Sequence, residues 1–320
     1  MKRSEYAELA EKESEHWAKL AEIQEEGLSW LHSPTVEKFV NWRITGDRDM
    51  NWFGYVVGKF VDGRVDGPGM CLGCNDGFFD RQIMQAGLCS KFDGYDISKK
   101  AVANAQKEAD TAGLDIKYHV CDLNFAEFPE DDYYGLVTAV MSLHHVDLLD
   151  DLFEKVARAM KPRSIFAINE YVGPNRFQWT DDQHKAINNL LKTLPPRLRK
   201  RSIDGKVIDQ LDRVREKDLI EVTPFEAIRS EEILPLLEKH FTILERRDYG
   251  GSVLGWLLNY LVPNFNEESE EDRCILDLLA RVDYLLTQPG GLASDFTCII
   301  ATKKFDASNN PWPEFAEVLG

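Results

Sequence analysis

Residues 67–83 read GPGMCLGCNDGFFDRQI, and their pattern predicts a turn from a strand into a helix. A short apolar run is followed by GCNDG at 73–77 and then by a pattern typical of a helix. Glycine lets a backbone take left-handed angles and approach another group closely, and a helix start offers free N–H groups. The corner is therefore either an ordinary tight turn or a cradle for a nucleotide-like cofactor.

From this corner onward, strand-like and helix-like segments alternate. Helices are predicted at 76–87, 98–113, 146–162 and 230–241, with Ser98 as an N-cap and Gly113 as a stop signal. Strands are predicted at 70–74, 91–97, 115–123, 133–143, 163–173, 242–251 and 294–305. This order predicts an α/β protein with a Rossmann-like, doubly wound, mostly parallel seven-stranded sheet.

Three further regions carry helical patterns outside this alternation. Residues 1–66 are predicted to form an N-terminal helical cap region, beginning with an amphipathic helix over about 4–31. The main domain then covers 67–320, with helical insertions at about 174–228 and 251–291. Both insertions are too long for simple loops, so we expect them to act as lids.

Composition narrows the classes of function. Of the 320 residues, 43% are hydrophobic and 29% charged, which is ordinary, but the net charge is −17. Such an acidic chain disfavours nucleic acid as a partner. No signal peptide and no apolar run of about 18 residues is evident, so we expect a cytoplasmic protein without a membrane partner. Cys71 and Cys74 form a C-x-x-C without a second pair, which leaves zinc or redox chemistry as a weakly supported alternative to buried thiols.

Polar and glycine residues follow four of the predicted strands. In an open parallel sheet, ligands bind beyond the carboxyl ends of the strands. Asp96 there could accept hydrogen bonds from both hydroxyls of a ribose, and Asp122 is placed to meet the edge of a base. Taken one at a time, the glycine-rich segment is explained equally well by a tight turn, and each aspartate by a helix cap. The residues concerned are those of 73–77, Asp96 with Ile97, Asp122 with Leu123, and Met141 to Val146.

In this order and spacing, residues 69–173 resemble the class I S-adenosylmethionine-dependent methyltransferases, small-molecule type, and the last two strands agree in topology. The resemblance implies S-adenosylmethionine as the cofactor. Cys71 stands where the family often has an acid, and Asn75 replaces the middle glycine. A dinucleotide oxidoreductase would need further glycines where Asn75 and Phe78 stand. The implied cofactor-binding residues are Gly73, Cys74, Asn75, Gly77, Asp96, Ile97, Asp122, Leu123 and Met141.

The methyl acceptor implied by this resemblance is a small molecule, most simply a hydroxyl, so we predict a metal-independent O-methyltransferase. The candidate catalytic residues are His144 and His145 as bases, with Glu170 in reserve. A structural role for the histidine pair is the alternative. Tyr171, Arg176 and Gln178, which follow the fifth strand, are predicted to bind substrate.

Other functions stay open at this level. They are N-methylation of a small molecule, methylation of a protein, and a non-catalytic S-adenosylmethionine-binding scaffold. The basic run PPRLRKR at 195–201 is either salt-bridged or a site for an anionic substrate group. A homodimer is also left open.

Overall fold

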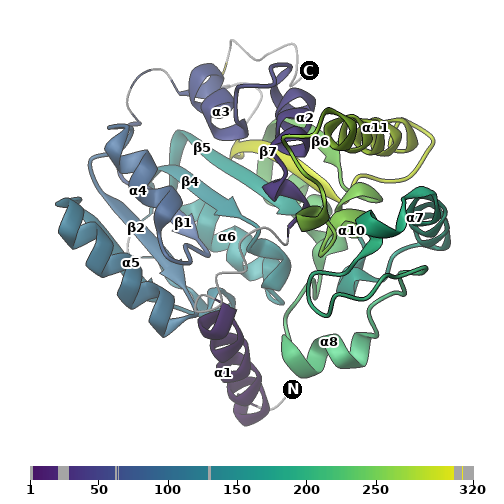
Figure 1. Ribbon diagram of the computed structural model, residues 1–320. Coiled ribbons are helices and arrows are strands. Elements are labelled where there is room, and N and C mark those ends of the chain that lie inside the picture. Colours follow the sequence, from purple (N-terminus) through teal and green to yellow (C-terminus); the bar gives the residue numbers. More distant parts are fainter. Residues whose placement is uncertain are drawn as a thin grey trace.

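The computed structural model describes residues 3–20, 29–61, 63, 65–128, 131–305 and 312. At its centre is a seven-stranded sheet of order β3-β2-β1-β4-β5-β7-β6 (Figure 1). The first five strands are parallel, and β7 runs antiparallel between β5 and β6. The predicted mostly parallel α/β sheet is confirmed. The strands are β1 Gly69–Leu72, β2 Phe92–Asp96, β3 Ile116–Val120, β4 Tyr134–Val140, β5 Met160–Tyr171, β6 Phe241–Gly250 and β7 Phe296–Lys303.

The register of the central strands aligns their carboxyl ends. Leu72 of β1 lies opposite Tyr95 of β2 and Ala139 of β4. Val140 of β4 in turn lies opposite Asn169 of β5. Chain order reverses between β1 and β4, so the loops after these strands open at one edge, where ligands bind in such sheets.

Helices cover both faces of the sheet. On one face, α6 (Leu149–Ala159) and α9 (Ile233–His240) bury Val156 and Leu237 in a core with β4 and β5. On the other face lie α4 (Phe78–Gln85) and α5 (Lys99–Ala112). As predicted, α5 starts at Ser98, whose hydroxyl accepts the N–H of Ala101, and ends at a left-handed Gly113.

The N-terminal helices divide between two places. α1 (Arg3–Leu20) lies at the carboxyl edge of the sheet, apart from α2 (Pro34–Thr45) and α3 (Trp52–Phe60) (Figure 1). The predicted first helix is confirmed up to Leu20, and residues 21–28 lie outside the described residues. α2 and α3 share one apolar core with α4 and α5, while the division into domains at residue 66 stays a prediction.

Both insertions contain helices, most of which lie to the right of the sheet in Figure 1, while α8 (Glu216–Val222) lies at the bottom of that view, near α1. The first contains α7 (Asp181–Thr193) and α8 (Glu216–Val222), and the second contains α10 (Leu254–Leu258) and α11 (Glu270–Leu286). Thr180 and Gln183 form a reciprocal capping box that starts α7. Within the described parts of the chain, none of the helices has both the length and the apolar character needed to cross a membrane.

Candidate active site

The turn after β1 is shaped by close contacts with neighbouring strand ends. Gly73 has φ +76°, and a Cβ there would lie 2.3 Å from Cβ of Ser142. Gly77 has φ +69°, and its Cβ would lie 2.1 Å from the Tyr118 hydroxyl oxygen. Asn75 also adopts a left-handed conformation, with φ +48°. Glycine at 73 and 77 is therefore required by packing, and this packing exposes the turn's backbone to the sheet edge.

A cavity of about 280 Å³, named here the strand-end cavity, opens at this edge. Seven of the nine residues predicted to bind the cofactor line it, while Cys74 and Gly77 belong to the turn without lining it. α1, through Glu13 and Trp17, and Phe225 from the first insertion also line the cavity, although no sequence motif placed them there. The lining residues are Glu13, Trp17, Gly73, Asn75, Asp96, Ile97, Cys121, Asp122, Leu123, Asn124, Val140, Met141, Ser142, His145, Val146 and Phe225.

Asp96 is anchored at the end of β2 by two backbone groups. Its Oδ2 accepts the N–H of Asn75 at 2.9 Å, and its Oδ1 accepts the N–H of Ser98 at 2.8 Å. Burial raises the pKa of Asp96, although both N–H groups act in the opposite direction. A carboxylate offers about four lone-pair directions, so each oxygen retains one for a ligand hydroxyl. Its position fits the predicted contact with a ribose.

Asp122 is engaged by the N-terminal helix. Its Oδ1 accepts the backbone N–H and the side-chain amide of Asn124, both at 3.0 Å, and its Oδ2 accepts the Tyr6 hydroxyl at 2.7 Å. The Tyr6 ring lies 5.0 Å from Phe125 and 5.3 Å from Phe225, measured between centroids. Burial, followed by Asp122, raises the pKa of Tyr6. α1 thus covers the end of the cavity where the base of a nucleotide was expected.

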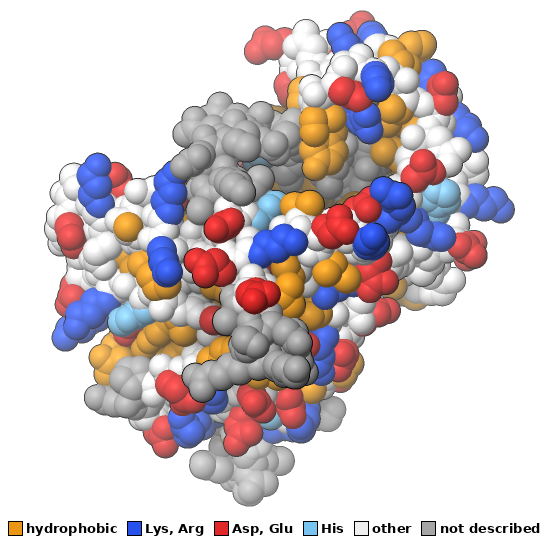
Figure 2. Space-filling model, turned by 90° about the horizontal axis from the view of Figure 1, so that it is seen from below, with side chains coloured by type: hydrophobic (Ala, Val, Ile, Leu, Met, Phe, Trp, Pro, Cys, Tyr) orange, Lys and Arg blue, Asp and Glu red, His pale blue; other side chains and the backbone are white. Residues whose placement is uncertain are grey.

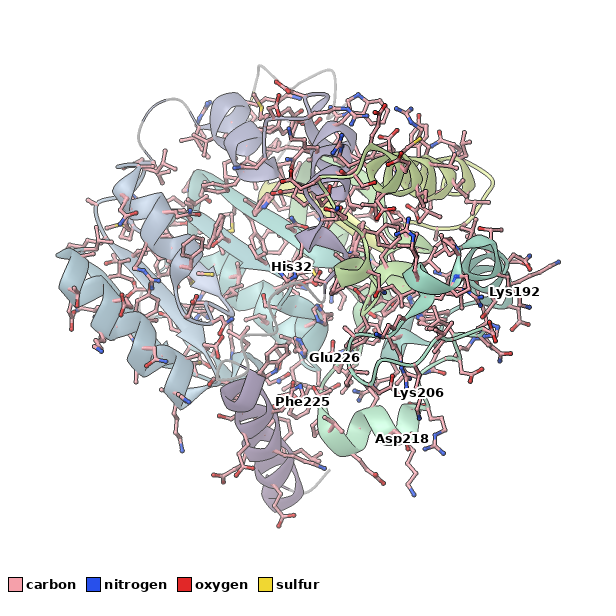
Figure 3. All side chains as sticks on the ribbon, in the orientation of Figure 1. His32, Lys192, Lys206, Asp218, Phe225 and Glu226 are labelled. Carbon is pink, nitrogen blue, oxygen red and sulfur yellow. The ribbon has the colours of Figure 1, made fainter. Side chains whose placement is uncertain are left out.

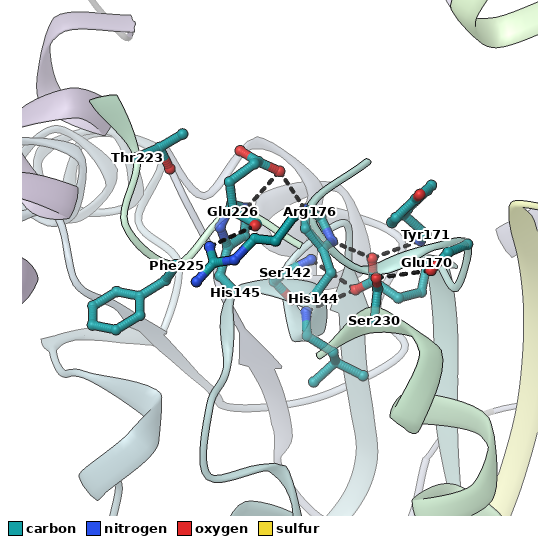
Figure 4. A network of polar contacts seen from close by, with 12 residues as sticks. Ser142, His144, His145, Glu170, Tyr171, Arg176, Thr223, Phe225, Glu226 and Ser230 are labelled. Carbon is teal, nitrogen blue, oxygen red and sulfur yellow. Dashed lines mark hydrogen bonds and ion pairs between the residues drawn. The ribbon is translucent and has the colours of Figure 1, made fainter. Parts of the chain in front are cut away.

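Five side chains between α1, β4, β5 and the first insertion form what we call the histidine–glutamate cluster: Glu13, His144, His145, Glu170 and Glu226. Figure 4 labels the two histidines, Glu170 and Glu226. Figure 3 shows Glu226 and the adjacent Phe225 beside α1.

Glu170 is the fully buried anchor of this cluster. Its Oε2 accepts the backbone N–H groups of Ser142 at 2.9 Å and Leu143 at 2.7 Å. Its Oε1 accepts the N–H of Tyr171 at 2.6 Å and lies 2.5 Å from Nδ1 of His144. Four donors therefore hold this carboxylate and fix the loop after β4 to the end of β5.

His144 lies between two carboxylates. Its Nε2 is 3.3 Å from Oε1 of Glu226, on the side opposite Glu170. Burial alone lowers the pKa of His144, but Glu170 and then Glu226 outweigh burial and raise it to about 10. For Glu226, burial raises the pKa, but His145 and His144 outweigh burial and lower it to about 2. Each ring nitrogen of His144 therefore lies beside a carboxylate oxygen, Nδ1 beside Glu170 and Nε2 beside Glu226.

His145, the next residue, has a different environment. Its Nδ1 is 3.3 Å from Oε1 of Glu13, its Nε2 is 3.9 Å from Oε1 of Glu226, and its ring contacts Trp17 edge-on. Both ring nitrogens are buried, and neither has a well-aligned hydrogen bond to any described residue. Glu13 itself accepts the indole N–H of Trp17 at 2.9 Å and the Thr223 hydroxyl at 2.9 Å. Burial acts to raise the pKa of Glu13, but the contacts with His145 and Trp17 lower it.

The three residues predicted to bind substrate have different positions. Tyr171 is buried and donates its hydroxyl to the carbonyl of Pro174 at 2.8 Å. Arg176 donates to the backbone carbonyls of Pro224 and Glu226, so it holds the loop that carries the cluster. Gln178 donates to the carbonyl of Arg176. Tyr171 lines a second, larger cavity, whereas Arg176 and Gln178 line neither that cavity nor the strand-end cavity.

A second cavity, of about 1590 Å³ and named here the aromatic cavity, adjoins the first. Trp17, Val140, Met141 and His145 line both cavities. The indole N–H of Trp256, in its wall, donates to Asp295 at 2.9 Å. Its aromatic lining comes from α1, the turn before α2, α3, α4, both insertions and the sheet: Trp17, Trp30, Trp52, Phe53, Phe79, Tyr171, Phe177, Trp179, Tyr249, Trp256, Tyr260 and Phe296.

The three arginines of the basic run at 195–201 form ion pairs. Arg197 contacts Asp272, Arg199 contacts Asp209, and Arg201 contacts Asp204. Seen from below, Lys and Arg side chains lie beside Asp and Glu around apolar patches (Figure 2). The salt-bridged alternative for this run therefore agrees with the structure.

Comparison with known proteins finds a family match over the part of the chain that forms strands β1 to β5. Residues 70–168 match the family described as "Methyltransferase domain". The chain is 27% identical over 95 residues to 24-methylenesterol C-methyltransferase 3 of Arabidopsis thaliana, and 28% identical over 95 residues to 24-methylenesterol C-methyltransferase 2 of the same plant. Each match spans 29% of this chain and only 26% of the curated relative.

Two solved structures share the fold over most of the chain. Geranyl diphosphate C-methyltransferase from Streptomyces coelicolor, in complex with Mg²⁺, geranyl diphosphate and S-adenosyl-L-homocysteine, has a TM-score of 0.52 at 12% identity, covering 92% of this chain and 98% of that one. A geranyl diphosphate methyltransferase in complex with S-adenosylmethionine has a TM-score of 0.50 at 12% identity, covering 78% of this chain and 83% of that one.

Proposed function

We propose that this chain, whose residues 70–168 form a class I S-adenosylmethionine-dependent methyltransferase domain, methylates a large, mostly apolar small molecule. S-adenosylmethionine supplies a methyl group on a positively charged sulfur when bound. The strand-end cavity fits it, because Asp96 can accept its ribose hydroxyls and Asp122 lies where its base would be. Glu13, Asp96 and Asp122 line this cavity and, among the described residues, no Lys or Arg does. That charge suits a cationic ligand.

The continuity of the two cavities carries this proposal. The aromatic cavity is far larger than the strand-end cavity and meets it at Trp17, Val140, Met141 and His145. Aromatic walls bind apolar surface and orient it through a few polar groups. An acceptor bound in the aromatic cavity would present one atom at this junction, beside the bound methyl donor.

We propose a hydroxyl as the acceptor atom. The histidine–glutamate cluster makes the junction polar, and the nitrogens of His145 have no hydrogen-bond partner among the described residues. Of the three predicted catalytic residues, His145 lines both cavities. His144 and Glu170 would position it, because Glu170 ties the loop that carries both histidines to β5.

Methylation at carbon is the second candidate. Trp and Tyr faces stabilise cations, and transfer of a methyl group to an alkene creates a carbocation. The matched plant relatives are named as sterol C-methyltransferases, although the match spans about a quarter of their length. This favours carbon over nitrogen as the competing acceptor atom.

The test uses S-adenosylmethionine labelled with ¹³C in its methyl group. We expect the protein to bind the unlabelled cofactor in calorimetry and to transfer label to members of a panel of phenols, sterols and isoprenoid alcohols. Carbon NMR of the product then distinguishes O-, N- and C-methyl groups. Absence of cofactor binding would refute the proposal, whereas binding without transfer to any class would favour the non-catalytic scaffold.

Two further expectations belong to this proposal. We place the reaction in the cytoplasm, which cell fractionation checks. The homodimer left open by the sequence is checked by light scattering on the purified chain.

A further inference from the structure

Three side chains of the histidine–glutamate cluster are spaced as metal ligands. One ligand atom each from His144, His145 and Glu226 lies within 4.8 Å of the other two. Nε2 of His144 is 3.3 Å, and Nε2 of His145 is 3.9 Å, from Oε1 of Glu226. Ligand atoms about 2.0–2.1 Å from a shared ion are themselves roughly 3 Å apart. Small side-chain adjustments would therefore bring all three atoms onto one ion.

The surroundings of His144 support this assignment. Metal-binding histidines usually donate their second ring N–H to a carboxylate, which fixes the tautomer and the orientation of the ring. Nδ1 of His144 does so with Glu170 at 2.5 Å, leaving Nε2 directed at the cluster. Glu170 is itself immobilised by three backbone N–H groups, so the imidazole has a rigid support.

His145 supplies an independent observation. Its ring nitrogens are buried and neither makes a hydrogen bond to a described residue. Buried polar atoms nearly always have a partner, because leaving one unsatisfied costs free energy. An ion coordinated at one nitrogen, with Glu13 accepting from the other, would satisfy both.

The charge of the cluster points the same way. Glu13 is 2% exposed, Glu170 is fully buried, and the Glu226 side chain is 13% exposed. Arg176 approaches this loop but donates to the backbone carbonyls of Pro224 and Glu226 rather than to a carboxylate. Two buried carboxylates and the partly exposed Glu226 around two imidazoles form a strong site for a cation.

We propose that His144, His145 and Glu226 bind one divalent transition-metal ion, such as Zn²⁺, Mn²⁺ or Co²⁺, and that this ion holds the oxygen of the acceptor hydroxyl. Mixed imidazole and carboxylate donors suit these ions better than Mg²⁺ or Ca²⁺, which prefer oxygen ligands. All three ligands line the aromatic cavity, so an open coordination position would face the acceptor. The inference rests on the proposed function, and it replaces the expectation of metal-independent transfer.

The ion acts here as a Lewis acid. Coordination lowers the pKa of the acceptor hydroxyl, whose proton is released to solvent water. The oxygen then uses a lone pair to form the new O–CH₃ bond, while the C–S bond breaks and its electron pair returns to sulfur. No oxidant or reductant is consumed, and the metal keeps its oxidation state.

Metal binding is tested directly on the full chain after chelation and dialysis. Titration with Co²⁺ should produce a visible absorption band saturating at one ion per chain, and calorimetry with Zn²⁺ should give the same stoichiometry. We expect His145→Ala and Glu226→Gln to weaken binding by about 100-fold or more, and Glu170→Gln by about 10- to 100-fold. His240→Ala is the matched control, because His240 also pairs with a carboxylate, Asp150, but lines neither cavity.

Affinity for S-adenosylmethionine, measured on the same samples, separates this inference from the proposed function. Variants that bind the cofactor within about threefold of the parent are folded, so their loss of Co²⁺ binding supports the site. A parent chain that binds the cofactor but neither metal overturns the inference, as does a His145→Ala variant with parental metal affinity. Metal binding by a chain that fails to bind the cofactor supports the site and refutes the proposed function.

Discussion

The strand-end cavity and the aromatic cavity share four residues but are assembled differently. Most of the strand-end lining comes from between residues 73 and 146, at the ends of four adjacent parallel strands. The aromatic lining runs from Trp17 to Phe296 and includes residues from α1, α3, both insertions and the sheet. The first cavity is local in topology, whereas the second exists only when distant segments meet.

The two adjacent histidines show the same difference on a smaller scale. His144 faces inward to Glu170 and Glu226, while His145 reaches α1 through Glu13 and Trp17. One residue along the chain therefore changes the surroundings from a hydrogen-bonded charge network to two nitrogens that lie beside carboxylates without a well-aligned hydrogen bond to a described residue. We therefore expect that substitutions in the strand-end cavity and in the aromatic cavity can be made independently, except at the residues that line both cavities.

The largest effect is expected at the junction itself. Replacing His145 with Ala should lower turnover by about 10²–10⁴-fold, because it removes the polar group that faces both ligands. Affinity for S-adenosylmethionine should change little, since Asp96 and the turn are untouched. Single-turnover rates at saturating cofactor measure this, with His240→Ala as the control. Near-parental turnover would show that the junction is structural.

The second largest effect is expected in the strand-end cavity and concerns cofactor affinity alone. Asp96→Ala should weaken S-adenosylmethionine binding by about 30- to 150-fold, equivalent to roughly 2–3 kcal/mol, through loss of charge-assisted hydrogen bonds. Calorimetry measures the affinity. Asp115→Ala, which removes an exposed acid before β3, is the control. Unchanged affinity in the Asp96 variant would place the cofactor elsewhere.

A smaller effect is expected in the aromatic cavity and concerns only the KM for the acceptor. Trp256→Ala removes an aromatic wall and should raise KM for the acceptor by roughly 30-fold, about 2 kcal/mol, with no change in cofactor affinity. Trp256→Phe keeps a ring and should lose less. Steady-state kinetics with the labelled donor measure both variants. Equal KM values for parent and Trp256→Ala would contradict an acceptor in the aromatic cavity.

The smallest effect concerns Asp80, buried beneath the turn, whose carboxylate oxygens lack hydrogen-bond partners among the described residues. Burial raises its pKa to about 7 from the usual 3.8, so the folded chain holds a proton that the unfolded chain releases. The free energy of unfolding should consequently fall as pH rises from about 4 to 7. Asp80→Asn should reduce this fall and stabilise the protein at pH 8 by about 1–2 kcal/mol.

Urea unfolding at pH 5 and pH 8 measures the effect of Asp80. The exposed variant Asp115→Asn should keep the parental dependence on pH. An Asp80→Asn variant with the parental dependence would mean that other groups cause it. Asp295, whose pKa burial also raises from 3.8 to about 7, is the first alternative to examine.

Much of the fold followed from local pattern. Alternating strand and helix signals, Ser98 and Gly113 as helix boundaries, and the turn at 73–77 predict a mostly parallel sheet and place its ligand edge. Seven predicted cofactor residues line one cavity because the ends of parallel strands necessarily meet. Cys74 and Gly77 lie in the same turn without lining it, because Gly77 is needed for contact with Tyr118.

The sequence by itself therefore determined the sheet, its ligand edge and the similarity of residues 70–168 to a methyltransferase domain, since these depend on neighbours along the chain. Only the tertiary structure decided the partners of the two histidines and the aromatic cavity. Glu13 approaches His145, and Glu226 approaches His144, across distances in sequence that no periodicity encodes. Arg176 holds the loop of Glu226 through backbone carbonyls, contacts that sequence cannot reveal because every residue has a carbonyl.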